Sequence, residues 1–197
     1  MNNKNNSKEL FFYVIILLSE AFMKKILLIL FACFLFTGCS LIPSTSSGTT
    51  KIRTSFGSYR IPGTWEKNNS HSTLTKYFFI NKNDRNVKTP NNISVEMGTN
   101  RYSKDDHIKF RQAIMSQISM QMKGQKVTIN GSGSTTKQGY IVYTFIIESD
   151  NGLNYTIQHY IVGDYKYVLV HETIWDGNRE DADNAAKKIV NTFRWKD

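Results

Sequence analysis

Alternating apolar and polar positions dominate the second half of the chain. Four segments there are rich in β-branched and aromatic residues and are bounded by turn residues, a pattern typical of strands. Asp150-Asn151-Gly152 is a hairpin signal between the second and third segments, and Gly163-Asp164 has the same role between the third and fourth. We therefore predict an antiparallel meander of four strands, which are residues 126–130, 139–148, 153–162 and 165–174.

The first half of the chain predicts three further strands and one loop. Pro62-Gly63 ends the first, irregular strand, and alternation of apolar residues marks the third. The polar stretch 81–92 has no periodicity and predicts an exposed loop. The predicted strands are residues 52–61, residues 74–80 and the segment that carries Ile93, Val95 and Met97.

Two amphipathic helices separate and follow these strands. Ser103 with Asp106 three residues later is a helix-cap signature. Apolar residues then recur at helical spacing over about 18 residues, which predicts a helix with one face on a sheet. A second stripe predicts the closing helix. Strands followed by helices indicate the α+β class, an antiparallel sheet flanked by helices. The two stripes are Phe110, Ala113, Ile114 and Ile118, and Ala182, Ala185, Ala186, Ile189 and Phe193.

The N-terminal segment has the pattern of an export signal. Lys24-Lys25 forms a positive region after Met23, and residues 26–36 form an eleven-residue apolar run. As a helix this run rises about 16 Å, too short for a hydrocarbon core of about 30 Å. Phe36-Thr37-Gly38-Cys39 then resembles the bacterial lipobox, with Phe36 where leucine is usual. Residues 23–38 are therefore interpreted as a lipoprotein signal peptide.

The lipobox resemblance implies that the membrane is a partner of this chain. In such lipoproteins the cysteine, here Cys39, receives a diacylglyceryl group, becomes the first residue after cleavage and is acylated with chains such as palmitate. Several acyl chains anchor a protein stably. Ser40 after the cysteine resembles an outer-membrane sorting signal, so in a Gram-negative cell the protein would face the periplasm.

The predicted domain organisation follows from this anchor. Residues 1–22 are interpreted as a non-native upstream extension with translation starting at Met23; a two-patch leader is the alternative. Residues 39–50, rich in Ser and Thr, predict a lipidated flexible tether. Residues 51–197 are long enough for one sizeable core and form the predicted folded domain.

Cysteine usage and charge narrow the function classes. Cys33 lies in the removed segment, so the mature chain keeps Cys39 alone and cannot form an internal disulfide. The formal charge is +9, and residues 1–38 carry four lysines and two glutamates, which leaves +7 on the mature chain. This balance fits a lysine-rich surface, an anionic membrane face or an acidic partner protein. No run of five like charges is present, which argues against nucleic acid.

The sequence contains no recognisable catalytic or metal-binding constellation. His159 and His171 lie in neighbouring predicted strands, and pairing Val162 with Tyr165 places the two imidazoles on opposite faces, which disfavours a shared metal. Residues 131–134 (GSGS) predict a turn and lack the nucleophile-elbow pattern. Asp176-x-Asn178-x-Glu180 offers calcium ligands without an EF-hand loop. We expect no enzyme activity, no cofactor and no resident metal.

Residues 53–197 resemble the PsbP-like group, which includes Mog proteins and bacterial envelope lipoproteins of the DcrB type. The shared marks are P-x-x-W, here Pro62 and Trp65, and I-x-x-S-F, here Ile189, Thr192 and Phe193, with Thr in place of Ser. The resemblance implies a sheet between helices and mainly protein-binding roles. It also implies that lipoproteins of this kind can serve as immunity proteins against a periplasmic toxin.

A membrane-anchored, non-catalytic protein-binding domain is the function favoured by these patterns. Exposed tyrosines are common at interfaces, so Tyr160, Tyr165 and Tyr167 and the loop 81–92 are the candidate contact residues. The +7 balance predicts an acidic partner protein. An envelope enzyme with an unrecognised site and a structural factor of an envelope complex are the alternatives. Trp65 and Trp195 are predicted to be buried.

Overall fold

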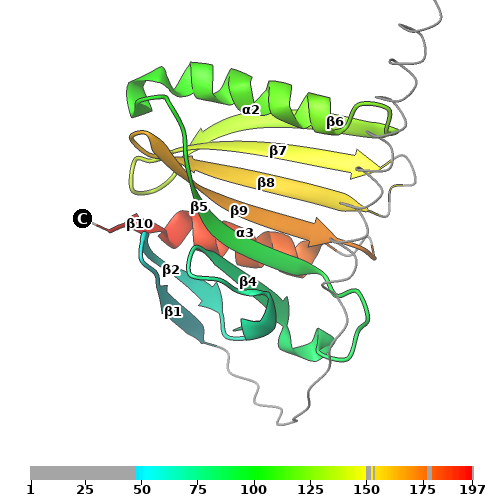
Figure 1. Ribbon diagram of the computed structural model, residues 1–197. Coiled ribbons are helices and arrows are strands. Elements are labelled where there is room, and N and C mark those ends of the chain that lie inside the picture. Colours follow the sequence, from blue (N-terminus) through cyan, green and yellow to red (C-terminus); the bar gives the residue numbers. More distant parts are fainter. Residues whose placement is uncertain (1–47, 150–151, 153, 177–178, 197) are drawn as a thin grey trace, which may run out of the picture. The chain divides into compact units, whose positions relative to one another are not determined.

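The computed structural model describes residues 48–149, 152, 154–176 and 179–196 (Figure 1). Within them, ten antiparallel strands form two sheets, with orders β1-β2-β10 and β3-β4-β5-β9-β8-β7-β6. The predicted α+β class is thus confirmed. The strands are β1 (Thr49–Arg53), β2 (Gly57–Pro62), β3 (Trp65–Lys67), β4 (Lys76–Asn81), β5 (Asn92–Thr99), β6 (Val127–Thr135), β7 (Ile141–Ser149), β8 (Tyr155–Val162), β9 (Lys166–Ile174) and β10 (Arg194–Trp195). The helices are α2 (His107–Gln121) and α3 (Glu180–Thr192), with 3-10 turns η1 (Asn69–His71), η2 (Lys82–Asp84) and η3 (Lys104–Asp106).

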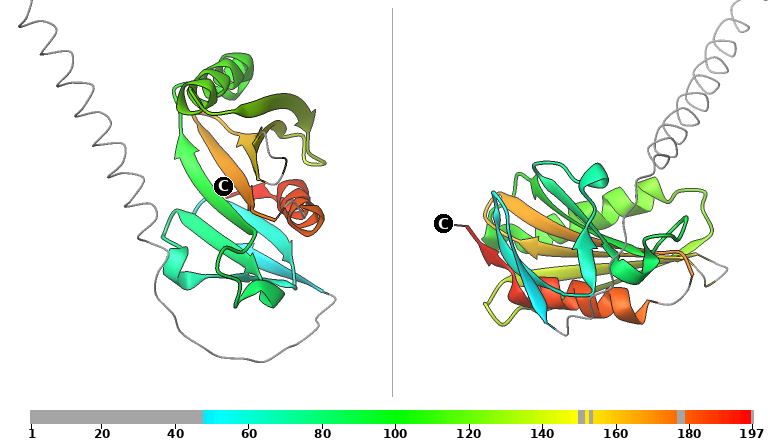
Figure 2. Two further views of the ribbon diagram at one scale, coloured as in Figure 1. Left: turned by 90° about the vertical axis from the view of Figure 1, so that its right-hand side faces the viewer. Right: turned by 90° about the horizontal axis from the view of Figure 1, so that it is seen from below.

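The large sheet is covered on both faces (Figure 2). On one face α2 packs over β7, β8 and β9, with Phe110, Ile114 and Ile118 buried against the sheet. On the other face α3 and the inner side of the small sheet enclose the second apolar cluster. Both clusters lie within the compact unit Ser44–Asp197, so this unit has the core that it needs to fold by itself.

Strand alternation explains why β8 and β9 are apolar on both sides. In β8, Ile161 belongs to the cluster under α3, while Tyr160 and Val162 belong to the cluster under α2. Successive side chains of a strand point to opposite faces, so a strand that is covered on both faces needs apolar residues at odd and at even positions. The predicted meander is confirmed, with β6 to β9 paired in order and every pair antiparallel. Asp150 and Asn151 of the predicted Asp-Asn-Gly turn lie outside the described residues.

The predicted helix start is also confirmed. Ser103 caps η3, and its hydroxyl accepts a bond from the Asp106 backbone N–H. The closing helix ends at Thr192, one residue before Phe193, which is buried in an extended conformation instead. Its buried face is rich in alanine, so the backbone of α3 can lie close to the sheet.

The sequence predicts a single strand over residues 52–61. The structure instead forms the hairpin of β1 and β2 there. The Thr54 hydroxyl accepts from Gly57 N–H (3.0 Å) and donates to the Gly57 carbonyl (2.9 Å), which closes the turn. At Gly57, a Cβ would lie 2.3 Å from the Arg194 carbonyl oxygen, so glycine permits β10 to join the sheet. β1 also includes Thr49 and Thr50, which were assigned to the tether.

Residues 131–134 are part of strand β6, so the turn predicted there is wrong. Gly131 pairs with Phe145 and Gly133 pairs with Tyr143. A Cβ at these glycines would approach the two rings to 3.2 Å and 3.1 Å. The glycines therefore make room for aromatic rings that lean across the edge strand. The short strands β3 and β10 were not predicted at all.

The β8–β9 turn lies one residue further along the chain than predicted. Asp164 and Tyr165 form the loop, and the Gly163 N–H donates to the Lys166 carbonyl (2.9 Å). Val162 pairs with Tyr167 instead of Tyr165. This shift moves the register by an even number of residues, so each side chain keeps its face.

The two tryptophans differ in burial. Trp65 is 3% exposed, which confirms the prediction, and its indole N–H donates to Asp181 Oδ2 at 3.1 Å. Trp195 is only partly buried at the edge of the α3 cluster. Its ring meets Phe193 edge-on with centroids 4.9 Å apart.

Replacing Trp65 by Ala should lower the free energy of unfolding by about 3–5 kcal/mol, because the change leaves a cavity in the cluster under α3. The measurement is chemical denaturation of residues 44–197. Trp195→Ala is the matched comparison and should lose less, because part of its ring is already in water. Equal losses for the two variants would contradict the burial difference.

Candidate functional site

The three candidate tyrosines do not form one surface. Tyr160 is 6% exposed, and its ring lies 5.9 Å from the Phe110 ring of α2. Tyr167 is partly buried, 5.5 Å from the same ring. Burial raises the pKa of both phenols. Tyr160 therefore belongs to the core under α2, and its assignment to a contact surface is wrong.

Tyr165 is the exposed member of the three, at the tip of the β8–β9 hairpin. Its side chain is 57% exposed, and its backbone has φ +57°. Among the described residues it is the one non-glycine with positive φ. A bulky residue in this region is strained, and such strain is found mainly where function requires it. The strain marks the tip as a candidate functional feature.

Backbone hydrogen bonds hold the tip against the chain that leads into α2. The Tyr165 N–H donates to the Tyr102 carbonyl, and the Asn100 N–H donates to the Tyr165 carbonyl, each at 3.0 Å. The Asp164 carboxylate accepts from the Lys104 N–H at 3.2 Å. Tyr165 is therefore presented on a fixed support.

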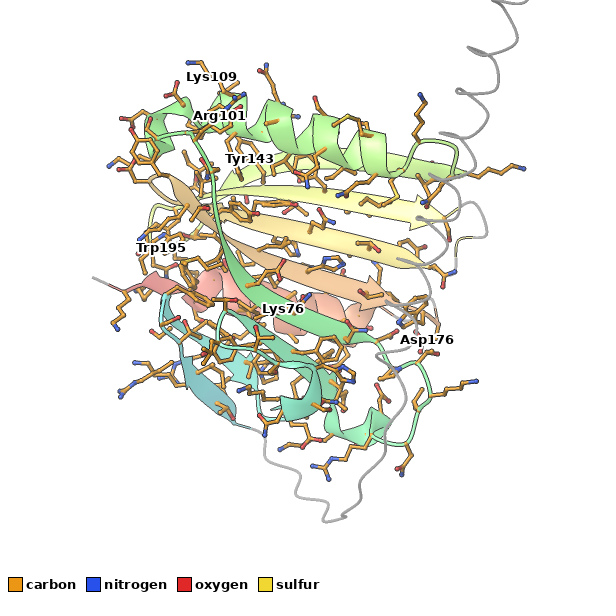
Figure 3. The ribbon with its side chains drawn as sticks, in the orientation of Figure 1. Lys76, Arg101, Lys109, Tyr143, Asp176 and Trp195 are labelled. Atoms are coloured by element: carbon orange, nitrogen blue, oxygen red, sulfur yellow. The ribbon has the colours of Figure 1, made fainter. Side chains whose placement is uncertain are left out.

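Cations surround this tip and are positioned by aromatic rings. The Arg101 guanidinium lies 5.3 Å from the Tyr102 ring, and the Lys166 ammonium lies 4.7 Å from the Trp195 ring. Figure 3 shows Arg101, Lys109 and Trp195 at the same end of the domain. Lys109 pairs with Asp106 at 2.7 Å, and this contact lowers the pKa of the Asp106 carboxyl. Rings of this kind hold long cationic side chains in place.

A pocket of about 310 Å³ lies beside the tip, between the start of α2 and the turn from β6 to β7. His107 is one of its lining residues, and the ring nitrogen Nδ1 of His107 lies 2.7 Å from the Tyr143 hydroxyl. We call the tip and this pocket together the hairpin end. The pocket is lined by Lys104, Asp105, His107, Gly139, Tyr140, Ile141 and Val162.

The loop 81–92 lies against the end of β9. The Asn91 amide donates to Asp176 Oδ1, and its oxygen accepts from the Trp175 N–H, both at 2.8 Å. Arg85 forms a two-pronged ion pair with Glu66, which lowers the pKa of that carboxyl. The predicted exposed loop is confirmed only in part: six of its twelve residues are exposed, Asn81 ends β4, Asn92 is buried at the start of β5, and the segment includes the 3-10 turn η2.

A buried polar chain on the α3 face of the sheet was missed by the sequence analysis. The Thr144 Oγ1 lies 2.8 Å from His159 Nδ1, and His159 Nε2 lies 2.7 Å from Glu172 Oε1. Glu172 is 1% exposed, and Asp183 of α3 is one of the groups that raise the pKa of its carboxyl. Asp183 in turn pairs with Arg179 at 3.4 Å. Three strands are thus joined through side chains.

A proton on Glu172 would supply the donor that the two carboxyl groups of this chain lack. Glu172 Oε2 and Asp183 Oδ1 are both buried and have no other donor among the described residues. Burial, together with Asp183, raises the pKa of Glu172. A neutral Glu172 donates to Asp183 and accepts from His159 Nε2–H, and His159 Nδ1 then accepts from the Thr144 hydroxyl. Every group in the chain is satisfied in this state.

This arrangement does not have the chemistry of a catalytic triad. A triad needs an ionised carboxylate to stabilise the imidazolium that forms as the nucleophile loses its proton. Here burial raises the pKa of Glu172, which disfavours the ionised carboxylate next to His159, and both side chains are shielded from solvent, Glu172 being 1% and His159 9% exposed. The chain is better suited to structure than to proton transfer.

The second strand histidine, His171, lies on the opposite face of the sheet. His159 pairs with Val170, and His171 pairs with Gln158, so the two imidazoles are separated by the sheet. Burial, with a contribution from Lys76, lowers the pKa of His171 to about 4. The described residues contain no group of three or more potential metal ligands. Asn178 of the calcium candidate lies outside them.

The lipidation candidate Cys39 and the whole signal segment also lie outside the described residues. In the part of the chain that the structure describes, no helix is both long and apolar enough to span a membrane.

Comparison with solved structures finds several likenesses. No family model and no curated protein matches the chain. The solution structure of cyanobacterial PsbP (CyanoP) from Synechocystis sp. PCC 6803 is similar over 80% of this chain and 98% of that chain, at 12% sequence identity and a TM-score of 0.49. At this level the likeness concerns chain architecture, and no argument about function rests on it.

Glu172→Gln tests the shared proton. The amide can donate to Asp183 and accept from His159 without a titrating proton. In the wild type the raised pKa means that the folded state binds more protons than the unfolded state, so stability falls as pH rises above about 4.5. In the variant, this decrease of stability with rising pH should be absent. At pH 8 the variant should be at least as stable as the wild type.

Glu180→Gln, the same substitution at an exposed position of α3, is the control and should leave the pH profile unchanged. His171 makes stability rise with pH between about pH 4 and pH 6.5, in the wild type and the variant alike. The quantity to compare is therefore the stability of the variant minus that of the wild type at each pH. A difference that does not vary with pH would show that Glu172 does not gain a proton on folding.

Proposed function

We propose that this protein is a lipid-anchored envelope lipoprotein whose folded domain binds a partner protein and performs no catalysis. The hairpin end is the contact surface. Within this class, the proposed role is that of an immunity protein that holds a periplasmic toxin. The observation that carries the binding proposal is the strained, exposed Tyr165 on its fixed support.

Three features of the hairpin end support protein binding. A tyrosine held in one position loses little conformational freedom on binding and offers a large apolar face with a polar tip. The adjacent pocket of about 310 Å³ can accept a side chain of the partner. Arg101, Lys104, Lys109 and Lys166 outnumber Asp105, Asp106 and Asp164 at this end, and this small positive excess suits an acidic partner and speeds its association at low salt.

Anchoring is the second part of the proposal. It rests on the signal pattern of residues 23–38 and on Cys39 directly after it. Lipid on Cys39 would place the domain on the outer membrane, facing the periplasm, if the cell is Gram-negative. A toxin that enters the periplasm would then meet its inhibitor at the membrane.

Cys39→Ser should abolish incorporation of a labelled fatty acid and leave unprocessed precursor, because the thiol is the site of lipid attachment. The measurement is metabolic labelling followed by gel electrophoresis. Ser40→Ala is the control and should be labelled normally. Labelling of the Cys39→Ser protein would remove the lipobox from the proposal.

Tyr165→Asn tests the hairpin end without disturbing the fold. Asparagine tolerates positive φ better than tyrosine, so stability should stay the same or rise by about 0.5–1 kcal/mol. Loss of the ring should weaken partner binding at least tenfold, as for a central aromatic contact. The measurement is capture from envelope extracts and from products of neighbouring genes by immobilised residues 44–197.

Leu74→Asn is the control, since Leu74 is 88% exposed and does not contribute to the hairpin end. A partner captured by the wild type and by Leu74→Asn, but not by Tyr165→Asn, supports the proposal. Equal capture by all three contradicts it. Hydrolysis of an envelope substrate by the purified domain, without capture, would favour the enzyme alternative.

A further inference from the structure

The outer face of the small sheet carries four cationic side chains. Lys51 and Arg53 of β1, Arg60 of β2 and Arg194 of β10 are all exposed. Lys51 is directly opposite Arg60, while Arg53 and Arg194 are each opposite Ser58. Directly paired residues share a face, so the four cations project to the same side. We call this surface the basic face.

No acidic residue compensates the basic face. The three strands read TTKIR, GSYRIP and RW and contain neither Asp nor Glu. Among the described residues, none of the four cations takes part in an ion pair with a carboxylate; Arg60 donates to the Thr49 hydroxyl and Arg194 to the Phe193 carbonyl. Like charges placed directly opposite each other destabilise a sheet. A face that keeps this repulsion is suited to an anionic partner.

A pocket of about 250 Å³ opens on the same face. Three of the four cations line it, and its other residues are neutral, among them Ser58 and Thr192. Hydroxyl and cationic groups that converge without a carboxylate form a suitable seat for a phosphate oxygen. The lining residues are Lys51, Ser58, Tyr59, Arg60, Gln138, Asn191, Thr192 and Arg194.

The position of β1 in the chain identifies the anionic surface. β1 begins at Thr49, ten residues after Cys39. Ten extended residues reach at most about 35 Å, and a flexible chain of this length averages about 17 Å. This step rests on the proposed lipid anchor. With that anchor, the small sheet is the part of the domain attached most directly to the membrane.

We propose that the basic face docks on anionic phospholipid headgroups of the membrane that holds the anchor. Headgroup phosphates lie against Lys51, Arg60 and Arg194, and the pocket receives one of them. Each such cation near an anionic surface strengthens binding about fivefold at ordinary ionic strength. Docking would fix the orientation of the domain, which the flexible tether alone cannot do.

The test uses residues 44–197 without lipid, so that the anchor plays no part. The probe is vesicles of phosphatidylcholine with or without phosphatidylglycerol, and the readout is co-sedimentation. The wild type should bind the anionic vesicles and lose binding as salt rises from about 0.05 M to about 0.5 M. Arg60→Gln with Arg194→Gln should weaken binding about 25-fold.

The control is Lys123→Gln with Lys126→Gln, which removes the same charge between α2 and β6, beyond the opposite face of the large sheet. It should weaken vesicle binding much less, and both double variants should keep the wild-type thermal midpoint. Equal weakening by the two pairs would overturn the proposal in favour of net charge alone. Absence of vesicle binding by the wild type would also overturn it. If the double variant Arg60→Gln, Arg194→Gln then failed to capture a protein that the wild type captures, the basic face would be the binding surface for that protein.

The proposal of membrane docking and the proposed function can each be contradicted without the other. Fatty-acid labelling tests the anchor on Cys39, and capture by the hairpin end tests the protein partner. The vesicle assay depends on neither result, because its domain carries no lipid and its variants leave Tyr165 unchanged.

Discussion

Burial of β8 and β9 on both faces is the constraint on which the rest of this domain depends. Each strand must place apolar side chains toward α2 and toward α3, and every polar group between them must find a partner inside the protein. Glu172 and His159 lie in this layer, 1% and 9% exposed, and satisfy each other. The helix α3 is held on the sheet by the packing of Ala182, Ala185 and Ala186.

Features that depend on residues close together in the sequence were predictable. The alternation of β-branched residues in β7 to β9 and the stripe Phe110, Ile114 and Ile118 each follow from one element and one buried face. The Ser103 cap needs no information beyond three neighbouring residues. These features give the α+β class and most of the core.

Features that depend on a distant partner were not predictable. Gly131 and Gly133 look like a turn in isolation and become a strand because the rings of Phe145 and Tyr143 occupy the space above them. Gly57 looks like an ordinary turn residue in the sequence, and its need to be glycine arises because β10, from the other end of the chain, joins β2 there. Glu172 was missed because its partners come from β7, β8 and α3. Tyr160 resembles Tyr165 in sequence, and only α2 decides which of them is buried.

The raised pKa of Glu172 has a calorimetric consequence. Between the ordinary pKa of a glutamic acid and its raised value in the fold, unfolding exposes this carboxyl to water and releases its proton to the buffer. The enthalpy recorded in a scanning experiment then includes the heat of protonating the buffer. The apparent unfolding enthalpy of this domain should therefore differ between phosphate and amine buffers at the same pH, even where the transition temperature is the same.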